Sequence, residues 1–271
     1  MLSFFKAQRM SIFKTLLINF KCLPFKQAIR LPIFIYSNCI LQSLGRIVIE
    51  APIERGMIRI GKRNFFRGYK TLWSNAGTFI FRGNALIEAG TQIQNCGTID
   101  FGAESRFCEC LKVLIVNKLT IGTSTQIAFE SIIMDTDFHN LVNMHKRNVK
   151  RCTKPIIIGS YNWFGNRCLV RKGTITPDHT IAATTSVLSH DFTENGENIM
   201  IAGNPAKCIG TGWRRLWKNR NNKEISKFFR EYPSAQEYVI TDVVNWDSFI
   251  IGDKEHGGDN FLPHNKYCKL D

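Results

Sequence analysis

The sequence predicts an all-β protein, a parallel β-helix built from six-residue repeats, with a helical extension at each end. Two observations predict this class. Apolar side chains recur every six residues in three blocks between residues 81 and 188, and small residues stand four positions after most of them. A period of six fits neither the turn of an α-helix, about 3.6 residues, nor the alternation of a single strand. It is typical of hexapeptide coils.

Each six-residue unit is expected to form one wall of a prism, with three walls closing a coil and coils stacking at about 4.8 Å. The apolar residue points inward, and the residue four positions later is small because the wall turns there. A β-sandwich that imitates the period by chance is the alternative, and three blocks nearly in phase argue against it. The repeated apolar positions are Phe81, Ile87, Ile93, Ile99, Ile115, Ile121, Ile127, Ile133, Ile158, Phe164, Val170, Thr176, Ala182 and Leu188.

The period breaks twice inside the predicted β-helix domain, which we assign to residues 47–210. The step from Ile99 to Ile115 is not a multiple of six, which predicts a small register shift within 108–112. The step from Ile133 to Ile158 is not a multiple of six either, and the polar stretch 139–154 lies within it. We expect this stretch to be a loop extruded from the coil, and such loops on rigid scaffolds often carry chemistry.

Both ends differ from the repeats. Residues 1–46 contain seven Lys and Arg residues and no acid, with apolar residues between them at roughly helical spacing. Such a basic amphipathic helix could lie on an anionic membrane surface, or it could pack its apolar side on the rest of the protein. Both interpretations stay open. Residues 211–271 form a C-terminal extension, with a short amphipathic helix expected over 222–232 and a second helical or irregular piece over 235–251.

Composition limits the class of protein further. The chain has 271 residues, and a net charge of 36 − 22 = +14 points to anionic partners. A hydrophobic content of 44 % excludes a disordered chain. Nine scattered cysteines without a Cys-x-x-Cys pair predict reduced thiols in the cytoplasm, rather than a disulfide framework or a structural zinc site. No apolar run reaches the roughly 20 residues that a spanning helix needs.

Two stretches resemble a known family, the left-handed β-helix acyltransferases. Residues 154–189 are similar to that family's C-terminal coils, and IAGNPAKCI at 201–209 matches its exit from the helix nearly letter for letter. The resemblance implies left-handed coils, a homotrimer with sites between neighbouring prisms, acetyl-CoA as co-substrate and no metal. The string Asp135–His139 looks most like the sugar O-acetyltransferases of bacterial surface polysaccharide synthesis.

The candidate base is His139, at the start of the expected loop. An acceptor hydroxyl needs a positioned base to remove its proton at neutral pH, and an imidazole suits this task. The resemblance matches His139 to the family's catalytic histidine. A nearby carboxylate in the same string could orient the ring, as in a catalytic triad. Asp135 and Asp137 both qualify, and the sequence does not choose between them.

The resemblance also implies a set of donor-binding residues. The backbone N–H of Asn166, after Gly165, would face the thioester carbonyl as an oxyanion donor. Ala183, Ser189 and Lys207 would line the groove for pantetheine and nucleotide. The chain departs from the family pattern at His190 and Gly210, where cations are common. Further candidate phosphate ligands, with no motif behind them, are Arg214, Arg215 and Lys218.

The predicted function is therefore transfer of an acetyl group from acetyl-CoA to a hydroxyl of a sugar, glycolipid or polysaccharide precursor, by direct attack in a ternary complex. A transferase acting on a small amino acid such as serine is one alternative. A γ-type carbonic anhydrase is less favoured, because no set of histidines lies one coil apart near His139. A nucleic-acid-binding module lacks any recognisable motif. The expected location is the cytoplasm, at the inner face of the cell membrane if residues 1–46 bind lipid.

Overall fold

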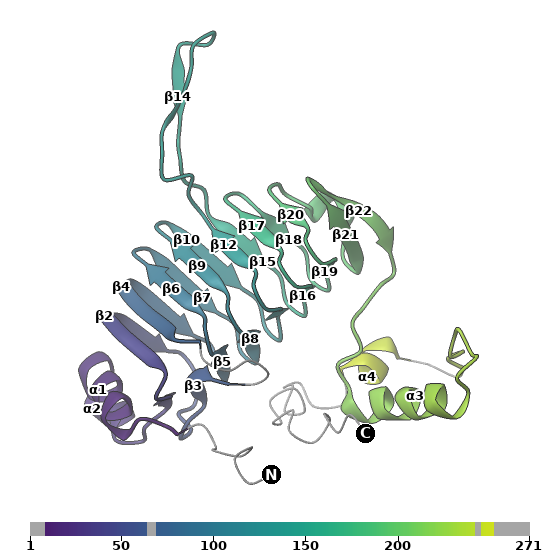
Figure 1. Ribbon diagram of the computed structural model, residues 1–271, viewed down its shortest axis with the longest axis horizontal. Helices are drawn as coiled ribbons and strands as arrows, with labels where there is room; N and C mark the ends of the chain where they lie inside the picture. Colours follow the sequence, from purple (N-terminus) through teal and green to yellow (C-terminus); the bar gives the residue numbers. More distant parts are fainter. Residues whose placement is uncertain (1–8, 64–68, 242–244, 252–271) are drawn as a thin grey trace. The chain divides into compact units, whose positions relative to one another are not determined.

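The computed structural model describes residues 9–63, 69–241 and 245–251. The chain divides into two units, residues 1–213 and residues 214–271. The first unit holds a left-handed parallel β-helix with helices at its N-terminal end, and the second holds two further helices (Figure 1). The all-β class with helical extensions is as predicted.

Three walls of parallel strands make the prism. The first contains β1 (Ile33–Ile35), β3 (Ile58–Lys62), β5 (Ala85–Glu88), β8 (Ser105–Phe107), β11 (Gln126–Ile127), β16 (Trp163–Phe164), β19 (Ile181–Ala182) and β21 (Ile199–Gly203). The second contains the first halves of β2 (Cys39–Ile49) and β4 (Thr71–Phe81), then β6 (Gln92–Asn95), β9 (Lys112–Ile115), β12 (Ile132–Met134), β17 (Leu169–Arg171) and β20 (Val187–Leu188). The third contains the second halves of β2 and β4, then β7 (Thr98–Phe101), β10 (Lys118–Ile121), β15 (Ile156–Ile158) and β18 (Ile175–Thr176).

The predicted inward positions are confirmed. Every residue of the repeated apolar series is buried, and most of the small residues four positions later are buried with them. Aromatic side chains fill the N-terminal coils: the ring centroids of Trp73 and Phe79 are 5.0 Å apart, and those of Phe101 and Phe107 are 4.9 Å apart. The C-terminal coils combine the buried rings of Phe164 and Phe192 with smaller residues such as Ala182.

The predicted register shift within 108–112 is wrong. Leu86 pairs with Arg106 before this segment and Gln92 pairs with Lys112 at its end, so the spacing between coils is the same on both sides. The extra residues lie on the third wall, where Ile99 and Phe101 both point inward and are buried. The spacing returns to three hexads at the end, where Leu169 pairs with Val187.

The corner between the second and third walls is packed backbone against backbone. A Cβ on Gly77 would lie 2.0 Å from the carbonyl oxygen of Gly97, and one on Gly97 would lie 2.2 Å from that of Asn117. Only glycine fits these two positions. One coil further along, the same corner opens into a hairpin.

The hairpin consists of β13 (Leu141–Asn143) and β14 (Asn148–Lys150), paired antiparallel. It leaves the prism after β12, returns before β15, and projects away from the coils (Figure 1). Thr136 and Thr153 form a bridge at its root. The stretch expected as an extruded loop is therefore an ordered arm.

The ends of the prism are closed differently. At the N-terminal end lie α1 (Ile12–Cys22) and α2 (Phe25–Ala28), while β1 and β2 begin before the boundary at 46 that the sequence suggested. At the other end, a short 3₁₀ turn, Thr193–Asn195, precedes β21, and β22 (Ala206–Thr211) then turns back antiparallel to β21. The exit motif 201–209 is thus the hairpin that ends the first wall.

The second unit contains α3 (Asn219–Glu231) and α4 (Trp246–Ile250). The indole of Trp217 is buried, and its backbone N–H donates to Ile250 O at 2.9 Å. Within the described ranges, no helix is long and apolar enough to cross a membrane. The eight cysteines in the described part are all free thiols.

Candidate active site

A tight turn fixes the position of His139 at the root of the hairpin. The His139 N–H donates to Asp137 O at 2.7 Å, across a Phe138 whose φ is +59°. This is a γ-turn of the rare kind with positive φ at its centre, a strained conformation for a bulky residue. Thr136 supports it, because its hydroxyl accepts a hydrogen bond from the Phe138 N–H at 2.9 Å. The imidazole is thereby held outside the prism.

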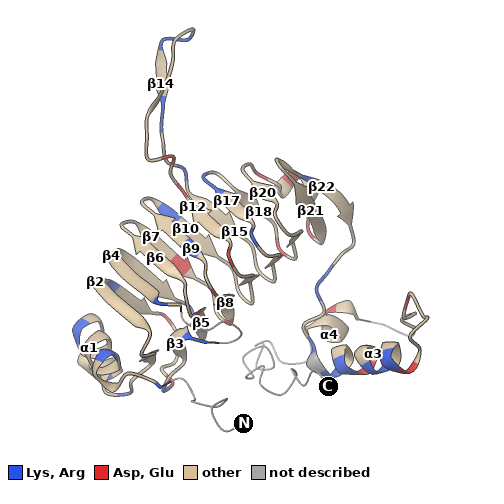
Figure 2. Cartoon of the chain, in the orientation of Figure 1, with Lys and Arg blue, Asp and Glu red and all other residues tan. Residues whose placement is uncertain are grey.

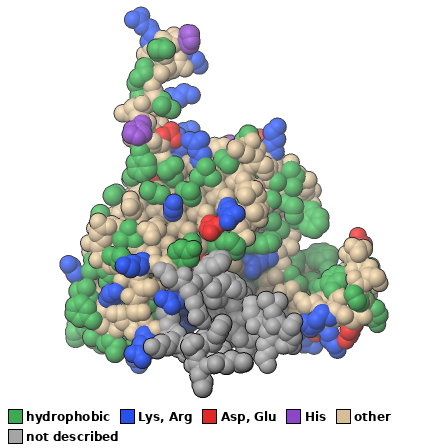
Figure 3. Space-filling view, in the orientation of Figure 1, with side chains coloured by type: hydrophobic (Ala, Val, Ile, Leu, Met, Phe, Trp, Pro, Cys, Tyr) green, Lys and Arg blue, Asp and Glu red, His purple; other side chains and the backbone are tan. Residues whose placement is uncertain are grey.

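An open pocket of about 300 Å³ adjoins this turn, between the hairpin and the next coil. Its lining is Asp137, His139, Leu141, Val142, Asn143, Lys150, Cys152 and Lys172. The hairpin around it stands clear of the prism and exposes hydrophobic and basic side chains together (Figure 3). No described residue makes a side-chain hydrogen bond to the imidazole of His139, so the ring is available to a substrate.

The two candidate orienting carboxylates have different surroundings. Asp135 is fully buried, and its carboxylate accepts the backbone N–H groups of Val116 at 3.0 Å, Asn117 at 2.7 Å and Lys118 at 2.9 Å. These amides belong to the preceding coil, at the corner where the hairpin leaves. The Asp135 carboxylate therefore closes this corner instead of facing the pocket.

Asp137 lies at the pocket and is paired with two cations. Lys172 forms an ion pair with one carboxylate oxygen, and Arg171 donates to the other at 3.1 Å. These contacts, that of Lys172 above all, hold the pKa of Asp137 below its usual 3.8, so the group is ionised at neutral pH. Lys172 also donates to the carbonyl oxygens of Arg151 at 3.3 Å and Cys152 at 3.2 Å.

Sequence reasoning missed Arg171 and Lys172. They stand at the corner of the coil after the hairpin, where β17 ends, and only the coil register brings them beside Asp137. The one feature of the sequence that could have indicated them is the pair of adjacent cations before Gly173. Such a pair is also typical of an ordinary surface turn.

The candidate donor residues lie at a different corner, between the first and second walls. Gly165 and Asn166 follow β16, and Ala183 follows β19 on the next coil. A Cβ on Gly165 would lie 2.7 Å from the Thr184 N, so this backbone is tightly stacked. The Asn166 carbonyl accepts from Thr185 N at 2.9 Å, whereas its own N–H donates to no described residue. That N–H is the one a developing oxyanion would need.

Ser189 and Lys207 are both exposed. Ser189 follows β20 at the corner between the second and third walls, and Lys207 lies on β22 opposite Ala202. Three further candidates belong to the second unit and have local partners there: Arg214 pairs with Asp247, Arg215 lies over the Trp217 ring, and Lys218 donates to Ser248 O. Their cationic groups thus have contacts within that unit.

One chain does not bring its candidate residues together. His139 and Ser189 stand at one edge of the second wall, and Asn166 and Ala183 at the opposite edge. The wall between these edges is one strand wide, and the three residues of β12 span about 10 Å. Within one chain, the residues of the two edges are thus separated by the length of one strand.

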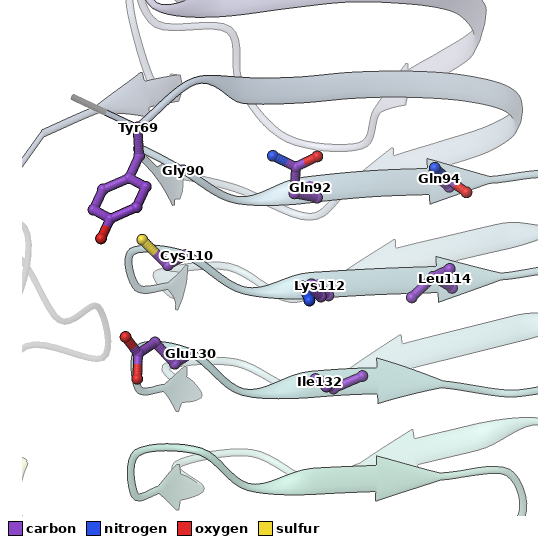
Figure 4. A pocket seen from close by; sticks show the side chains of 9 residues that line it. All are labelled: Tyr69, Gly90, Gln92, Gln94, Cys110, Lys112, Leu114, Glu130 and Ile132. Carbon is purple, nitrogen blue, oxygen red and sulfur yellow. The ribbon is translucent and has the colours of Figure 1, made fainter.

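A larger groove of about 490 Å³ runs over the outer side of the second wall. In Figure 4 the lining residues of successive strands stand in rows across the wall, and Tyr69, Cys110 and Glu130 lie where the strands begin, at the corner. Its other lining residues are Gly90, Gln92, Gln94, Lys112, Leu114 and Ile132. Leu114 pairs with Met134, the last residue of β12, so the groove ends beside the strand that leads to His139.

Known proteins share this architecture. No family model matches the chain. A polysialic acid O-acetyltransferase from Escherichia coli O1:K1 / APEC is 27 % identical over 107 residues, which is 40 % of this chain and 33 % of the relative. The chain resembles the hexapeptide-repeat sugar O-acetyltransferases. The resemblance inferred from the 201–209 motif is thereby confirmed, although the match spans about a third of the relative's length.

Solved structures of acetyltransferases are similar to the chain at lower sequence identity. The polySia-specific acetyltransferase NeuO has a TM-score of 0.46 and 19 % identity, covering 72 % of this chain and 99 % of its own. The polysialic acid O-acetyltransferase OatWY has a TM-score of 0.41 and 16 % identity, covering 70 % and 96 %. At these values the similarities carry no argument about the activity of the present chain.

The described residues were also compared with what a metal site needs. Among the residues that the structure describes, no three His, Cys, Asp or Glu side chains are grouped as a metal site would need. The pocket beside His139 contains one carboxylate, and that carboxylate is already paired with two cations.

Proposed function

We propose that the chain is an acyltransferase that moves an acetyl group from acetyl-CoA to a hydroxyl of a sugar, glycolipid or polysaccharide precursor. The observation that carries this proposal is the strained turn at Phe138, which presents the unpartnered imidazole of His139 to an open pocket. Strained backbone of this kind is concentrated at functional sites. The similarity to a polysialic acid O-acetyltransferase supports the choice of reaction.

The reaction needs no covalent enzyme intermediate. The imidazole of His139 takes the proton of the acceptor hydroxyl as its oxygen attacks the thioester carbon. The carbonyl oxygen becomes an oxyanion, and the Asn166 N–H donates to it. The C–S bond then breaks, and the thiolate of CoA leaves and takes the proton from the imidazolium. The products are an O-acetyl ester and free CoA.

The site is completed by a second copy of the chain. His139 and Asn166 occupy opposite edges of the second wall, so the base of one prism and the oxyanion donor of its neighbour would face one groove. Ala183 leaves room beside that donor for an extended pantetheine arm, with Ser189 and Lys207 further along toward the nucleotide. A closed cyclic assembly of three copies supplies three identical grooves of this kind.

Asp135 and Asp137 act on the geometry of the site. Asp135 holds the corner from which the hairpin leaves, through its three backbone hydrogen bonds. Asp137, held by Arg171 and Lys172, ties the root of the hairpin to the next coil. We assign both as positioning residues for His139. The free thiols of the described cysteines favour a cytoplasmic location.

The experiment that tests the function follows free thiol release from acetyl-CoA with a panel of acceptors. The panel contains neutral and acidic oligosaccharides, a membrane glycolipid extract and free serine. The proposal expects thiol release that depends on a saccharide, and a new ester on that saccharide by mass spectrometry. Release that depends on serine alone would contradict it, and so would the absence of acetyl-CoA turnover with every acceptor.

The groove on the second wall is proposed to hold the acceptor. Two amide side chains, a lysine and a tyrosine offer the donors and the ring surface that sugar hydroxyls and sugar rings use. The groove ends beside the strand that leads to His139, which would bring the acceptor hydroxyl toward the base.

Replacing Lys112 by alanine is expected to raise the KM for the saccharide by about tenfold, because a charge-assisted hydrogen bond is lost. The KM for acetyl-CoA should stay unchanged. Lys118→Ala, on the third wall, is the matched control, since Lys118 is equally exposed and outside the groove. Initial rates with each substrate varied in turn measure both constants. An unchanged saccharide KM in Lys112→Ala would remove the groove from the acceptor site.

A further inference from the structure

Helix α1 contacts the prism through its polar side. Asn19 donates to Thr15 O and to Ile33 O, each at 2.7 Å, and its side-chain oxygen accepts the Ile33 N–H at 3.2 Å. The Thr15 hydroxyl accepts the Ile35 N–H at 3.0 Å. Both side chains are buried. They bond the backbone of β1, so the helix is fixed to the first coil by hydrogen bonds.

The opposite side of α1 is apolar and exposed. Of the side chains there, Phe13 is 75 % exposed and Phe20 is 48 % exposed. The surface continues onto α2, where the ring of Phe25 lies 6.2 Å from that of Phe20. We call this surface the end patch; it consists of Ile12, Phe13, Leu16, Leu17, Phe20, Phe25 and Ile29. A contiguous apolar surface of this kind is uncommon on a soluble monomer and marks an interaction site.

The chain segment that carries the end patch has charges of one sign. No acid occurs between residues 9 and 49. The exposed cations beside it are Arg9, Lys21, Lys26 and Arg30. None of the four forms an ion pair with a described residue. Figure 2 shows Lys and Arg in blue on α1, and Figure 3 shows blue cations beside green hydrophobic side chains at this end of the prism.

We propose that the end patch docks the protein on an anionic lipid surface, with α1 lying in the plane of the membrane. The apolar side chains enter the boundary between headgroups and acyl chains, and the ring of cations meets the acidic headgroups. A second copy of this chain is the poorer occupant, because the same cations would then face one another. The proposal concerns location and is independent of the acetyl transfer reaction.

Of the two interpretations that the sequence left open, this geometry favours the membrane surface. An amphipathic helix that served only the fold would bury its apolar side. Here Ile18 is the one large apolar residue of α1 that is buried, while five others face outward. The helix is therefore fixed by Thr15 and Asn19, and its apolar side stays available.

The test is co-sedimentation of the full chain with vesicles of phosphatidylcholine, alone or mixed with phosphatidylglycerol. The test variant is the double substitution Phe13→Gln and Phe20→Gln. It removes two rings from the end patch and places good helix formers at both positions. The matched control is Ile209→Gln, because Ile209 is 60 % exposed on β22, away from α1. Equal melting temperatures in the three proteins show that each is folded.

The wild type and Ile209→Gln should bind the mixed vesicles at least about tenfold more tightly than pure phosphatidylcholine, and salt should weaken this binding. The double variant should lose at least about tenfold in affinity for the mixed vesicles. The proposal is overturned if the wild type stays in the supernatant, or if the double variant binds as well as Ile209→Gln. A smaller oligomer for the double variant without lipid, by analytical ultracentrifugation, would assign the patch to a second copy and overturn it too.

Discussion

Replacing His139 by alanine is expected to lower kcat for acetyl transfer by about 10²- to 10⁴-fold, because a positioned base contributes that much to hydroxyl attack. The KM for acetyl-CoA should change little, since the donor residues lie at another corner of the prism. Thiol release from acetyl-CoA with a saccharide acceptor measures both constants. The γ-turn is made by the backbone, so the hairpin root should keep its shape in the variant.

The matched control for this variant is His145→Ala. His145 lies on the same hairpin and is exposed, but it does not line the pocket. It should retain wild-type kcat. Equal losses in the two variants would mean that the hairpin matters as a surface and that His139 is not the base. A wild-type rate for His139→Ala would exclude it from the reaction.

Replacing Asp135 by alanine is expected to lower the free energy of unfolding by about 3 kcal/mol, because three backbone N–H groups at a partly buried corner lose their acceptor. Asp135→Asn should recover part of this loss, since an amide oxygen still accepts. Asp137→Ala should change stability by less than about 1 kcal/mol, because its ion pairs lie near the surface. Urea unfolding followed by circular dichroism gives these values.

This pair of variants separates two roles that the sequence could not separate. If Asp135 were the group that orients His139, Asp135→Ala would lose activity without losing stability. Equal stability in Asp135→Ala and the wild type would therefore contradict its place at the corner. The expected pattern is a large stability loss for Asp135→Ala, and for Asp137→Ala a loss of kcat through a loosened hairpin root.

The repeat pattern was enough to predict the fold. Apolar residues six apart favoured short strands around a common core. The repeated apolar residues between Phe81 and Leu188 point inward as expected. The size of the coils was not predictable from the period. The third wall has two inward residues per strand, such as Ile99 and Phe101. The six-residue period is therefore interrupted within a strand of that wall, not at a turn.

Candidate site residues could be named from the sequence, but their geometry could not be predicted from it. Sequence spacing placed His139 at the start of the hairpin, and its presentation depends on the positive φ of Phe138, for which no residue type gives a signal. Asp135 and Asp137 are equivalent in the sequence. They differ because the chain turns out of the coil between them. Asp135, next to the end of β12, is buried against backbone amides of the preceding coil, while Asp137 meets Arg171 and Lys172 of the following coil.

The separation of His139 from Asn166 is the feature with the largest consequence for the mechanism. Both positions were predicted as parts of one site, and the chain places them at opposite edges of a wall. The central claim is therefore that the site forms between copies. A mixed assembly of two inactive variants tests this claim directly.

His139→Ala removes the base, and Ala183→Phe fills the space proposed for pantetheine. Each variant alone should be nearly inactive. In trimers assembled at random from equal amounts of both, about a quarter of the grooves would combine an intact His139 from one copy with an intact Ala183 from its neighbour. We expect recovery of about a quarter of the wild-type rate, and a mixed assembly as inactive as its two parents would show that the site lies within one copy.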